Sequence, residues 1–465
     1  MTHLAPVMFA GLVVFLLLGY PAAFALAANG LLFAMIGIHA GLLDWSLLGA
    51  LPDRVLGIVS NQTLLAIPFF TFMGLILERS GMAEDLLTSI GQLFGPVRGG
   101  LAYAVILVGV LLAATTGVVA ASVIAMGLIS LPVMLRYGYD ARLAAGVIAA
   151  AGTLAQVIPP GLVLIVLADQ LGVPVGDMFR AAIPPSLMLT GMYIVFVFLL
   201  SLFRPSAVPA LPAEVRLLRG LALWRSAFFA IIPPLILIGI VLGSIFLGWA
   251  TPSEGGAVGA IGALILAAVK GKLNLMLLRE STERSMRLLS FVMFILIGST
   301  VFSLVFRGLN GDLWVEHLLS SLPGGLVGFL IVVNLFVFFL AFFLDFFEIA
   351  FIAIPLLAPA AQKLGIDLVW FGVLLALNMQ TSFMHPPFGF SLFYLRSVAP
   401  KEIRSNQIYL GAIPFLLIQL LMVALVIAFP GIVAGTVHQQ VRNGVIDVPM
   451  DGQGYGDYYL PKEWR

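Results

Sequence analysis

The sequence predicts an all-α polytopic membrane protein built as an inverted repeat with two re-entrant hairpins. Three observations predict this fold class: an apolar composition, two long apolar segments interrupted at their centres, and a proline pair that recurs in both halves of the chain. Hydrophobic residues make up 61% of the 465 residues and charged residues only 10%, whereas soluble domains carry about 25% charged residues. The chain shows no alternating strand pattern, so helices are expected to satisfy the backbone polar groups inside the bilayer.

Ten segments are long and apolar enough to cross a hydrocarbon core of about 30 Å as helices. They are 5–19, 21–38, 62–78, 143–168, 182–203, 228–249, 254–270, 288–306, 367–396 and 408–430. Two further apolar segments, 99–134 and 324–362, are too long for one ordinary span and carry TTG and LDFFE at their centres. Each predicts two half-helices folded back as a re-entrant hairpin, which is tolerated at membrane depth only where protein or a water-filled cavity surrounds it.

The distribution of basic residues supports this layout. If both termini face outward and the first hairpin enters from the cytoplasm, most of the 23 lysines and arginines fall in cytoplasmic loops, as the positive-inside rule requires. Counting either hairpin as a full crossing would place the downstream basic loops on the wrong side. Both termini are therefore expected outside.

The two halves of the chain repeat the same order of elements. A charged loop from Arg204 to Arg225 separates them, and in each half a hairpin precedes a span that is broken by two prolines. The segments AQVIPPGLVLIVLAD and TSFMHPPFGFSLFYL place Pro159 and Pro386 at an offset of 227 residues. Because the hairpins open to opposite sides, the halves form an inverted-topology repeat, an architecture typical of secondary transporters.

The breaks predict cation sites. Proline has no N–H, so each pair frees carbonyl oxygens from the helical ladder, and half-helix ends that face a common point near the midplane bind ions in such folds. Sodium, a hard cation, suits these oxygens. The first predicted sodium site comprises Thr115, Thr116, Gly117, Gly152, Val157 and Pro159, and the second comprises Asp345, Thr381, Ser382, Met384 and Pro386. The residues predicted to line a substrate cavity are Gln156, Asn378, Gln380 and His385.

Structural alternatives remain open for each residue type. The hydroxyl groups could simply bond back to helix carbonyls or pack helices together. The carboxylates of LDFFE could lie in water at the outer rim, and His385 could satisfy a local carbonyl. Glu254, in ATPSEGG, is interpreted as a helix cap together with Thr251 or the serine between them.

Other classes of function are less consistent with the sequence. The net charge of +1 gives no footprint for nucleic acid, and the lack of cysteine excludes disulfides and thiol chemistry. The N-terminal MTHLAPVMFA has no basic region of a cleavable signal peptide, and no phosphate-binding loop of an ATP-driven pump occurs. A membrane-embedded enzyme that uses Asp345, Glu348 and His385 remains an alternative, as does a sodium-independent organic-anion permease.

Several segments together resemble one family. They are LLAIPFFTFMGLILERSGMAEDL, AAGTLAQVIPPG, WATPSEGGAVGA, FLDFFEIAFIAIPLLAPAAQKLGID and FGVLLALNMQTSFMHPPFGFSLFYLRSVAP. From about residue 5 to residue 430 the chain is similar to the large membrane subunit of tripartite ATP-independent periplasmic (TRAP) transporters, of the DctM type. The resemblance implies an elevator-type fold and sodium-driven uptake of organic acids, with sodium as the coupling ion and no other cofactor. It implies no enzymatic activity.

The same resemblance implies partners and a location. A periplasmic substrate-binding protein would deliver the organic acid, and a small four-helix membrane subunit, expected as a separate polypeptide, would lie beside this chain. The location would be the bacterial inner membrane, with both termini periplasmic. The ending FGFSLFYLRSVAP is closer to the C4-dicarboxylate and 2-oxo-acid branches than to the sialic acid branch.

The resemblance also assigns predicted domains. They are 1–98, first-half scaffold helices; 99–181, first transport-domain half; 182–323, scaffold helices and cytoplasmic linker; 324–405, second transport-domain half; 406–430, last helix; and 431–465, periplasmic tail. Two departures from the family pattern stand out. The first hairpin tip reads ATTGVVAAS instead of several serines, which makes Thr115 the expected hydroxyl ligand, and His385 occupies a position where threonine is common.

Overall fold

The computed structural model describes residues 4–216, 220–320, 322–342, 344–386 and 389–433. The α-helices are α1 (Leu4–Leu17), α2 (Ala22–His39), α3 (Trp45–Gly49), α4 (Leu51–Val59), α5 (Ala66–Arg79), α6 (Met82–Phe94), α7 (Gly100–Thr116), α8 (Val119–Arg136), α9 (Ala141–Thr153), α10 (Leu162–Leu171), α11 (Val175–Phe203), α12 (Gly220–Phe246), α13 (Pro252–Val269), α14 (Leu275–Gly308), α15 (Gly311–Ser320), α16 (Gly325–Leu340), α17 (Phe346–Ile352), α18 (Ile354–Lys363), α19 (Leu368–Thr381), α20 (Phe390–Val398) and α21 (Ser405–Ala428). Short 3-10 turns are η1 (Leu154–Gln156), η2 (Pro205–Ala207) and η3 (Ala213–Val215). These residues contain no strand, and the predicted all-α polytopic fold is confirmed.

The helices differ in length according to their place in the repeat. Seven described helices, α2, α8, α11, α12, α13, α14 and α21, are long and apolar enough to cross a bilayer. The shorter apolar helices are α1, α7, α9 with η1, α10, α16 and α19. All of these except α1 are hairpin arms or halves of the two broken helices. Proline and glycine thus shorten the elements at the places where the sequence predicts breaks.

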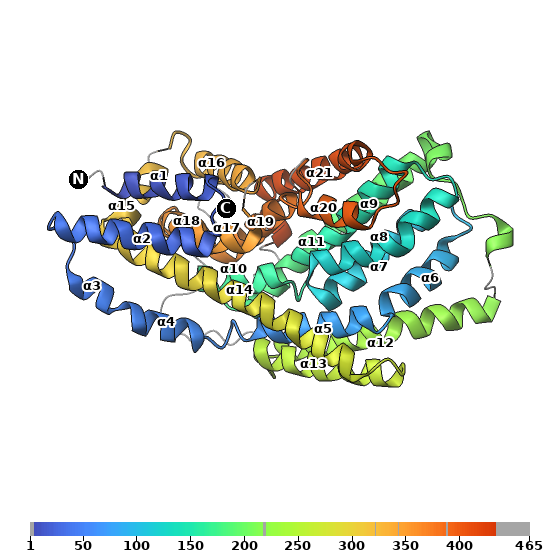
Figure 1. Cartoon of the computed structure of the whole chain (residues 1–465). Coiled ribbons are helices and arrows are strands. Elements are labelled where there is room, and N and C mark those ends of the chain that lie inside the picture. Colours follow the sequence, from blue (N-terminus) through green and yellow to red (C-terminus); the bar gives the residue numbers. More distant parts are fainter. Residues whose placement is uncertain (1–3, 217–219, 321, 343, 387–388, 434–465) are drawn as a thin grey trace.

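The two hairpins lie at opposite ends of the bundle (Figure 1). Helices α7 and α8 pack against each other at one end and turn at Gly117, whose φ is +58°. Helices α16, α17 and α18 lie at the other end, with α10 and α19 between the hairpins (Figure 1). This opposed arrangement is the one that the inverted repeat predicts.

The second hairpin is more open than the first. Its returning arm was expected to be one half-helix, but it consists of α17 and α18, which are bent by 52° at Ala353. Pro355 lies in the first turn of α18, where the lack of an N–H is tolerated. Helix α16 packs on α19 through Phe329 and Phe371, whose ring centroids are 6.0 Å apart, while α18 packs on α15.

Each half of the repeat packs its broken helix against the other half. Helix α9 lies on α21, where Gly146 and Gly411 let the two backbones approach so closely that an added Cβ on Gly146 would overlap the Gly411 carbonyl. Helix α19 lies on α11, where Gly372 accommodates Met178. The two halves are therefore interlocked through small residues, as is common for membrane helices.

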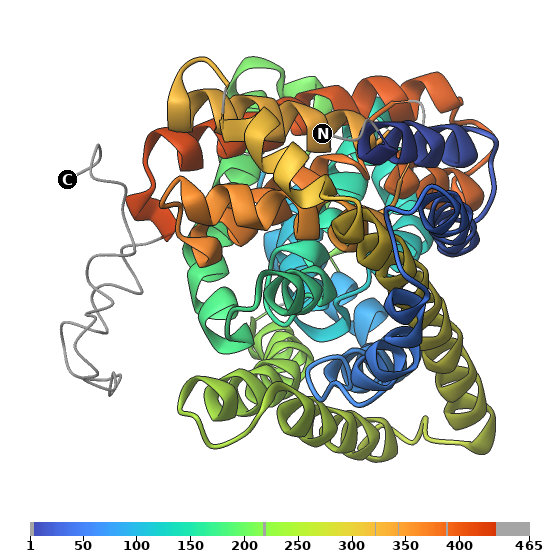
Figure 2. The same cartoon turned by 90° about the vertical axis from the view of Figure 1, so that its left-hand side faces the viewer.

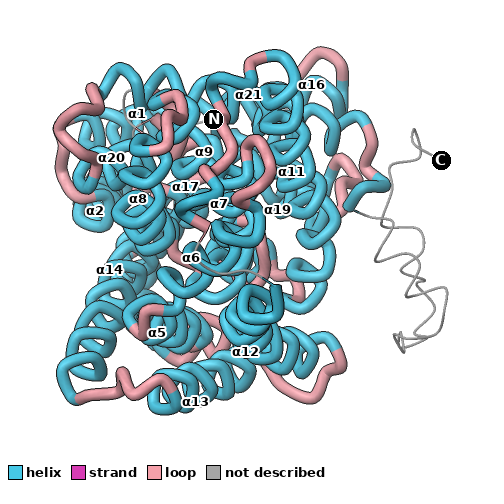
Figure 3. The backbone as a smooth tube through the Cα atoms, turned by 90° about the vertical axis from the view of Figure 1, so that its right-hand side faces the viewer, coloured by secondary structure: helices cyan, strands magenta, loops and turns pink. Residues whose placement is uncertain are grey.

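Two groups of helices surround this centre. In Figure 2, α14 runs along one side of the molecule beside α2. In Figure 3, α5, α12 and α13 form a layer along the bottom, below α7. The capping interpretation of Glu254 is confirmed, because Thr251 and Glu254 form a reciprocal capping box at the start of α13.

Four short helices have no counterpart in the predicted spans. Helices α3, α4 and α15 lie in stretches that the sequence analysis left between spans, and α6 lies within the loop between α5 and the first hairpin. Helix α14 was expected to start near residue 288 but begins at Leu275, where the Asn274 side chain accepts a hydrogen bond from Leu277 N. The short helices are below the length of a membrane span, and the start of α14 is polar, so a hydropathy criterion does not detect them.

Candidate functional site

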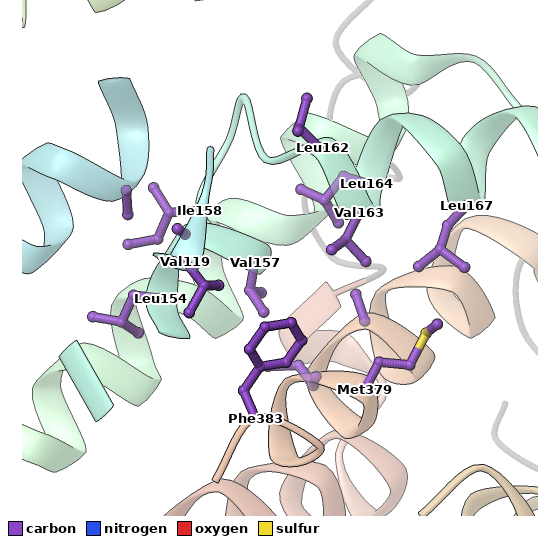
Figure 4. Packing of buried hydrophobic residues seen from close by; sticks show 14 of the residues in the cluster. Val119, Leu154, Val157, Ile158, Leu162, Val163, Leu164, Leu167, Met379 and Phe383 are labelled. Carbon is purple, nitrogen blue, oxygen red and sulfur yellow. The ribbon is translucent and has the colours of Figure 1, made fainter. Parts of the chain in front are cut away.

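The two broken helices meet inside the bundle. Helix α9 and η1 end at Gln156, and α10 starts at Leu162; helix α19 ends at Thr381, and α20 starts at Phe390. The Gln380 side chain, one residue before the end of α19, donates a hydrogen bond from Nε2 to Thr153 Oγ1 at the end of α9, 3.1 Å away. Side chains of both breaks also share one apolar cluster, which includes Val157 and Phe383 (Figure 4).

The tip of the first hairpin lies beside the first break. Thr115 and Thr116 are fully buried, and their hydroxyls donate to the carbonyl of Leu112 at 3.0 and 2.8 Å. A Cβ added to Gly117 would lie 3.4 Å from the carbonyl oxygen of Pro160. This tip is therefore held closed by its own hydroxyls and contacts the proline pair through main-chain atoms.

Main-chain oxygens are available at the first break. Pro159 and Pro160 have no N–H to donate to the carbonyls of Ala155 and Gln156, four residues earlier. A Cβ on Gly161 would lie 2.8 Å from the Gln156 oxygen and 2.9 Å from the Ala155 oxygen, so glycine lets the chain pass directly over both carbonyls. The sequence analysis predicted Val157 and Pro159 as cation ligands at this break. The spacing of a helical hydrogen bond adds the carbonyl oxygens of Ala155 and Gln156 as candidate ligands.

Of the other residues predicted for the first site, Gly152 faces the returning arm of the first hairpin. An added Cβ there would overlap the side chain of Val123 on α8. Gly152 therefore lets α9 pack tightly on the returning arm of the hairpin, and any role in a cation site falls to its carbonyl group.

The second break is ordered by side-chain hydroxyls. Thr381 Oγ1 donates to the Asn378 carbonyl at 2.6 Å, and Ser382 Oγ donates to the Met379 carbonyl at 2.5 Å. Met384 N donates to the Thr381 carbonyl at 2.9 Å. Ser391, on α20, closes the break by donating both its N–H and its hydroxyl to the Phe383 carbonyl.

Pro386, the first proline of the second pair, is half-buried. The second proline and the phenylalanine after it lie outside the described residues. The predicted ligands thus lie in one short stretch of chain: Thr381 ends α19, and Ser382, Met384 and Pro386 follow it.

The tip of the second hairpin is held by a carboxylate. Asp345 caps α17: its Oδ1 accepts from Glu348 N at 2.8 Å, and Asp345 N donates to Glu348 Oε2 at 3.0 Å. The ring of Phe346 lies 6.3 Å from the ring of Phe383, which places this tip beside the second break. Asp345 is near the predicted site, but one of its carboxylate oxygens is already bonded within the capping box.

The four residues predicted to line a substrate cavity share a common property. Each is at most 1% exposed and carries side-chain polar atoms with no hydrogen-bond partner in the described part of the chain. These atoms are both amide atoms of Gln156, Oδ1 of Asn378, Oε1 of Gln380, and Nδ1 and Nε2 of His385. A buried polar group without a partner costs about 1–3 kcal/mol, so each of these atoms calls for an explanation, such as a bound ligand, an ion or an ordered water.

His385 lies in an aromatic box. Its ring stacks on Phe342, with centroids 4.3 Å apart and an interplanar angle of 14°, and meets the edge of Phe338 at 4.2 Å. Neither ring nitrogen has a hydrogen-bond partner among the described residues, so no carbonyl in that part of the chain is satisfied by His385.

A buried polar network joins four helices at the point where the breaks meet. Thr153 Oγ1 accepts from Gln380 Nε2 at 3.1 Å and from Gln419 Nε2 at 3.2 Å, and it donates to the Ala150 carbonyl at 2.8 Å. Gln419 Nε2 also lies 2.9 Å from the Tyr193 hydroxyl. Of this network, the sequence analysis identified only Gln380. The offset of 227 residues could have indicated Thr153, since it is the repeat equivalent of Gln380.

The structure thus brings the predicted residues into two clusters. One combines the first hairpin tip with the first break, the other combines the second tip with the second break, and the bond between Thr153 and Gln380 connects them.

Comparisons with known proteins show the family to which the chain belongs. Residues 9–432 match the family model of the tripartite ATP-independent periplasmic transporter, DctM component. The chain is 31% identical over 373 residues to the C4-dicarboxylate TRAP transporter large permease protein DctM of Pseudomonas aeruginosa, covering 80% of this chain and 85% of that protein. It is 27% identical over 414 residues to the sialic acid TRAP transporter large permease protein SiaM of Vibrio cholerae, covering 89% and 93%.

Two further similarities concern another substrate and the fold. The isethionate TRAP transporter permease protein DctMQ of Oleidesulfovibrio alaskensis is 28% identical over 442 residues, which cover 92% of this chain and 66% of that protein. The crystal structure of the Alcanivorax borkumensis YdaH transporter, described as having an unusual topology, superposes with a TM-score of 0.59 at 17% identity and covers 92% of this chain and 98% of that one.

The family match spans nearly the whole chain, and the relatives are named as transporter permeases and not as enzymes. This multi-pass membrane protein therefore belongs to the DctM family of TRAP transporter large permeases.

Proposed function

We propose that this protein catalyses sodium-coupled uptake of a small organic acid by an elevator mechanism. The observation that carries the proposal is the meeting of two matched helix breaks at a set of buried polar atoms without partners. In secondary transporters, discontinuous helices at a repeat interface form the ion and substrate sites.

The cation part of the proposal rests on oxygen atoms. The hydroxyls of Thr115, Thr381 and Ser382 donate their protons to helix carbonyls, which leaves their lone pairs free to bind a cation. The proline pairs add carbonyls that receive no N–H from the residue four positions later. Each break therefore combines hydroxyl and carbonyl oxygens, the ligands that a hard cation prefers.

The substrate part rests on uncharged polar groups. Gln156 and His385 supply buried N–H groups with no partner among the described residues, and such donors can hold a carboxylate without a fixed positive charge. Asn378 and Gln380 add unpaired side-chain oxygens, which can accept a hydrogen bond from a substrate hydroxyl. The relatives are named for C4-dicarboxylates, sialic acid and isethionate, all of them organic anions. For this chain we propose a C4-dicarboxylate or a 2-oxo acid.

The wider system follows from the family. A periplasmic substrate-binding protein would deliver the acid, and a separate small four-helix membrane subunit would sit beside this chain in the bacterial inner membrane. Both termini would be periplasmic, with the hairpin of α7 and α8 opening to the cytoplasm. The scaffold and the mobile transport domain would follow the predicted domain boundaries.

Reconstitution tests the proposal. Vesicles that contain this chain with its small subunit should accumulate labelled succinate or labelled pyruvate only under an inward sodium gradient and only with the binding protein present. Equal uptake in sodium-free buffer would overturn the coupling and favour a sodium-independent permease. Uptake of neither acid under the gradient would overturn the substrate class.

Two hydroxyl deletions refine the test. Thr381→Val should raise the half-saturating sodium concentration more than Thr115→Val does, because the Leu112 carbonyl keeps the Thr116 hydroxyl when Thr115 is lost. Thr190→Val is the matched control, since Thr190 is buried and bonds only back to the Ser186 carbonyl, 2.9 Å away, on a helix outside both breaks. If Thr115→Val and Thr381→Val both keep wild-type sodium activation, main-chain oxygens alone would form the sites.

A further inference from the structure

Thr153 and Gln380 occupy equivalent positions of the inverted repeat. The proline pairs at Pro159 and Pro386 set an offset of 227 residues between the halves, and Thr153 and Gln380 are separated by the same 227 residues. Two equivalent residues can touch each other only where the pseudo-two-fold axis of the repeat passes between them. Their 3.1 Å hydrogen bond therefore marks that axis.

The bond also joins the chain segments that lead into the two proposed cation sites. Thr153 follows Gly152 and precedes the first break, while Gln380 precedes Thr381 and the second break. Both side chains are fully buried. A displacement of the main chain at one break is thus transmitted to the other through two side chains.

Two further helices fix this bond in place. Gln419 of α21 donates to Thr153, and its amide nitrogen lies 2.9 Å from the hydroxyl of Tyr193 on α11. Tyr193 is fully buried and packs edge-on against Phe415 with ring centroids 5.4 Å apart. The network therefore includes both broken helices and the helix that follows each of them.

We infer that the network formed by Thr153, Gln380, Gln419 and Tyr193 couples the two cation sites, so that sodium binding at one break promotes sodium binding at the other. The inference rests on the proposed function. Ordering one break lowers the entropic cost of ordering the second when a rigid contact joins them, and such coupling typically changes affinity by about 5- to 150-fold. The four residues are positioning residues in this scheme, because they act through the chain segments that hold the cations.

The test is the sodium dependence of substrate uptake in reconstituted vesicles. Wild-type uptake should rise with sodium with a Hill coefficient above 1. Thr153→Val removes the hydroxyl that joins the halves and should lower the Hill coefficient toward 1 and raise the half-saturating sodium concentration about fivefold or more. Uptake at saturating sodium should stay within about twofold of wild type, since the variant leaves the proposed oxygen ligands in place.

Two variants serve as controls, and two more serve as substitutes. Thr153→Ser keeps the hydroxyl and should keep the wild-type Hill coefficient. Thr190→Val makes the same substitution at a buried threonine that bonds only within its own helix, and it should also keep the wild-type value. If Thr153→Val does not fold, Gln419→Met and Tyr193→Phe take its place in the test. Both weaken the network but leave the hydrogen bond between Thr153 and Gln380 in place. Each should therefore lower the Hill coefficient only part of the way toward 1.

The outcomes separate the inference from the function on which it rests. An unchanged Hill coefficient in folded Thr153→Val, or a wild-type coefficient of 1 with sodium-dependent uptake, would overturn the coupling and leave the proposed function intact. Sodium-independent uptake by the wild type would overturn the proposed function itself.

Discussion

The two hairpins perform the same structural task with different chemistry. The first tip is small and closed: Thr115 and Thr116 bond back to Leu112, and Gly117 brings main-chain atoms against Pro160. The second tip is held by the capping box of Asp345 and is surrounded by phenylalanine rings. The repeat thus maintains the backbone break, while side chains differ between the halves.

This difference suggests a division of roles between the halves. At the position of Ile158 in the first half, the second half has His385, which is 227 residues later in the sequence. Ile158 belongs to the apolar cluster, whereas the two ring nitrogens of His385 have no partner among the described residues and lie within an aromatic box. The two halves therefore differ at this position, with an apolar side chain in the first and a polar ring in the second.

The largest effect is expected from displacing the first tip. A Cβ at Gly74 on α5 would lie 2.6 Å from the Thr116 carbonyl oxygen, and overpacking of this kind costs about 1–3 kcal/mol or more. Gly74→Val should therefore push the tip away from α5 and reduce sodium-driven uptake in vesicles to background. Gly191→Val is the matched control, because no atom lies within 4 Å of a Cβ at that position. Full uptake by folded Gly74→Val would show that the closed tip is not needed.

The next effect concerns the equivalent positions Ile158 and His385. His385→Phe removes two buried nitrogens without partners but keeps the ring stacked on Phe342. The midpoint of thermal unfolding in detergent should therefore stay constant or rise, while substrate uptake falls about tenfold, as for the loss of one buried hydrogen-bonding group. Ile158→Leu conserves volume and should change both quantities little. Wild-type uptake by His385→Phe would remove this residue from the substrate site.

The smallest effect distinguishes two roles of Asp345. Asn is as good an N-cap as Asp, whereas Ala lacks the acceptor and costs about 0.5–2 kcal/mol. Asp345→Ala should therefore lower the thermal midpoint, while Asp345→Asn should preserve it. If the carboxylate also binds a cation, both variants should raise the half-saturating sodium concentration. A wild-type sodium response in Asp345→Asn would reduce this residue to a helix cap.

The sequence predicts the spans and the breaks well because their causes are local. Runs of apolar residues determine the helices that cross the membrane. Gly117 and Pro159 interrupt the helical hydrogen-bond pattern whatever the surrounding tertiary structure. Short helices such as α4 and α6 escaped prediction because their apolar residues occupy only one face. The bend at Ala353 also escaped, although Pro355 was a visible signal.

The site is harder to predict because its contacts are distant in sequence. Hydroxyls at the breaks could be named from composition, but the partners of Gln380 depend on how α9, α19 and α21 pack. Gln419 and Tyr193 are single polar residues in long apolar spans, and nothing in their local sequence distinguishes them from residues that bond to their own helix. Helix packing alone brings them to the axis of the repeat.

The exchange of partners between the halves has a consequence for biosynthesis. The face of α9 that carries Gly146 packs on Gly411 of α21. Because α21 comes late in the sequence, Gly411 is synthesised only after all the helices from α10 to α20. Until then the face of α9 that packs on α21 is uncovered. The N-terminal half of the chain therefore lies in the membrane without its final helix packing. A truncated product that ends in the central linker would therefore be a substrate for membrane quality control, not an independently folded half-transporter.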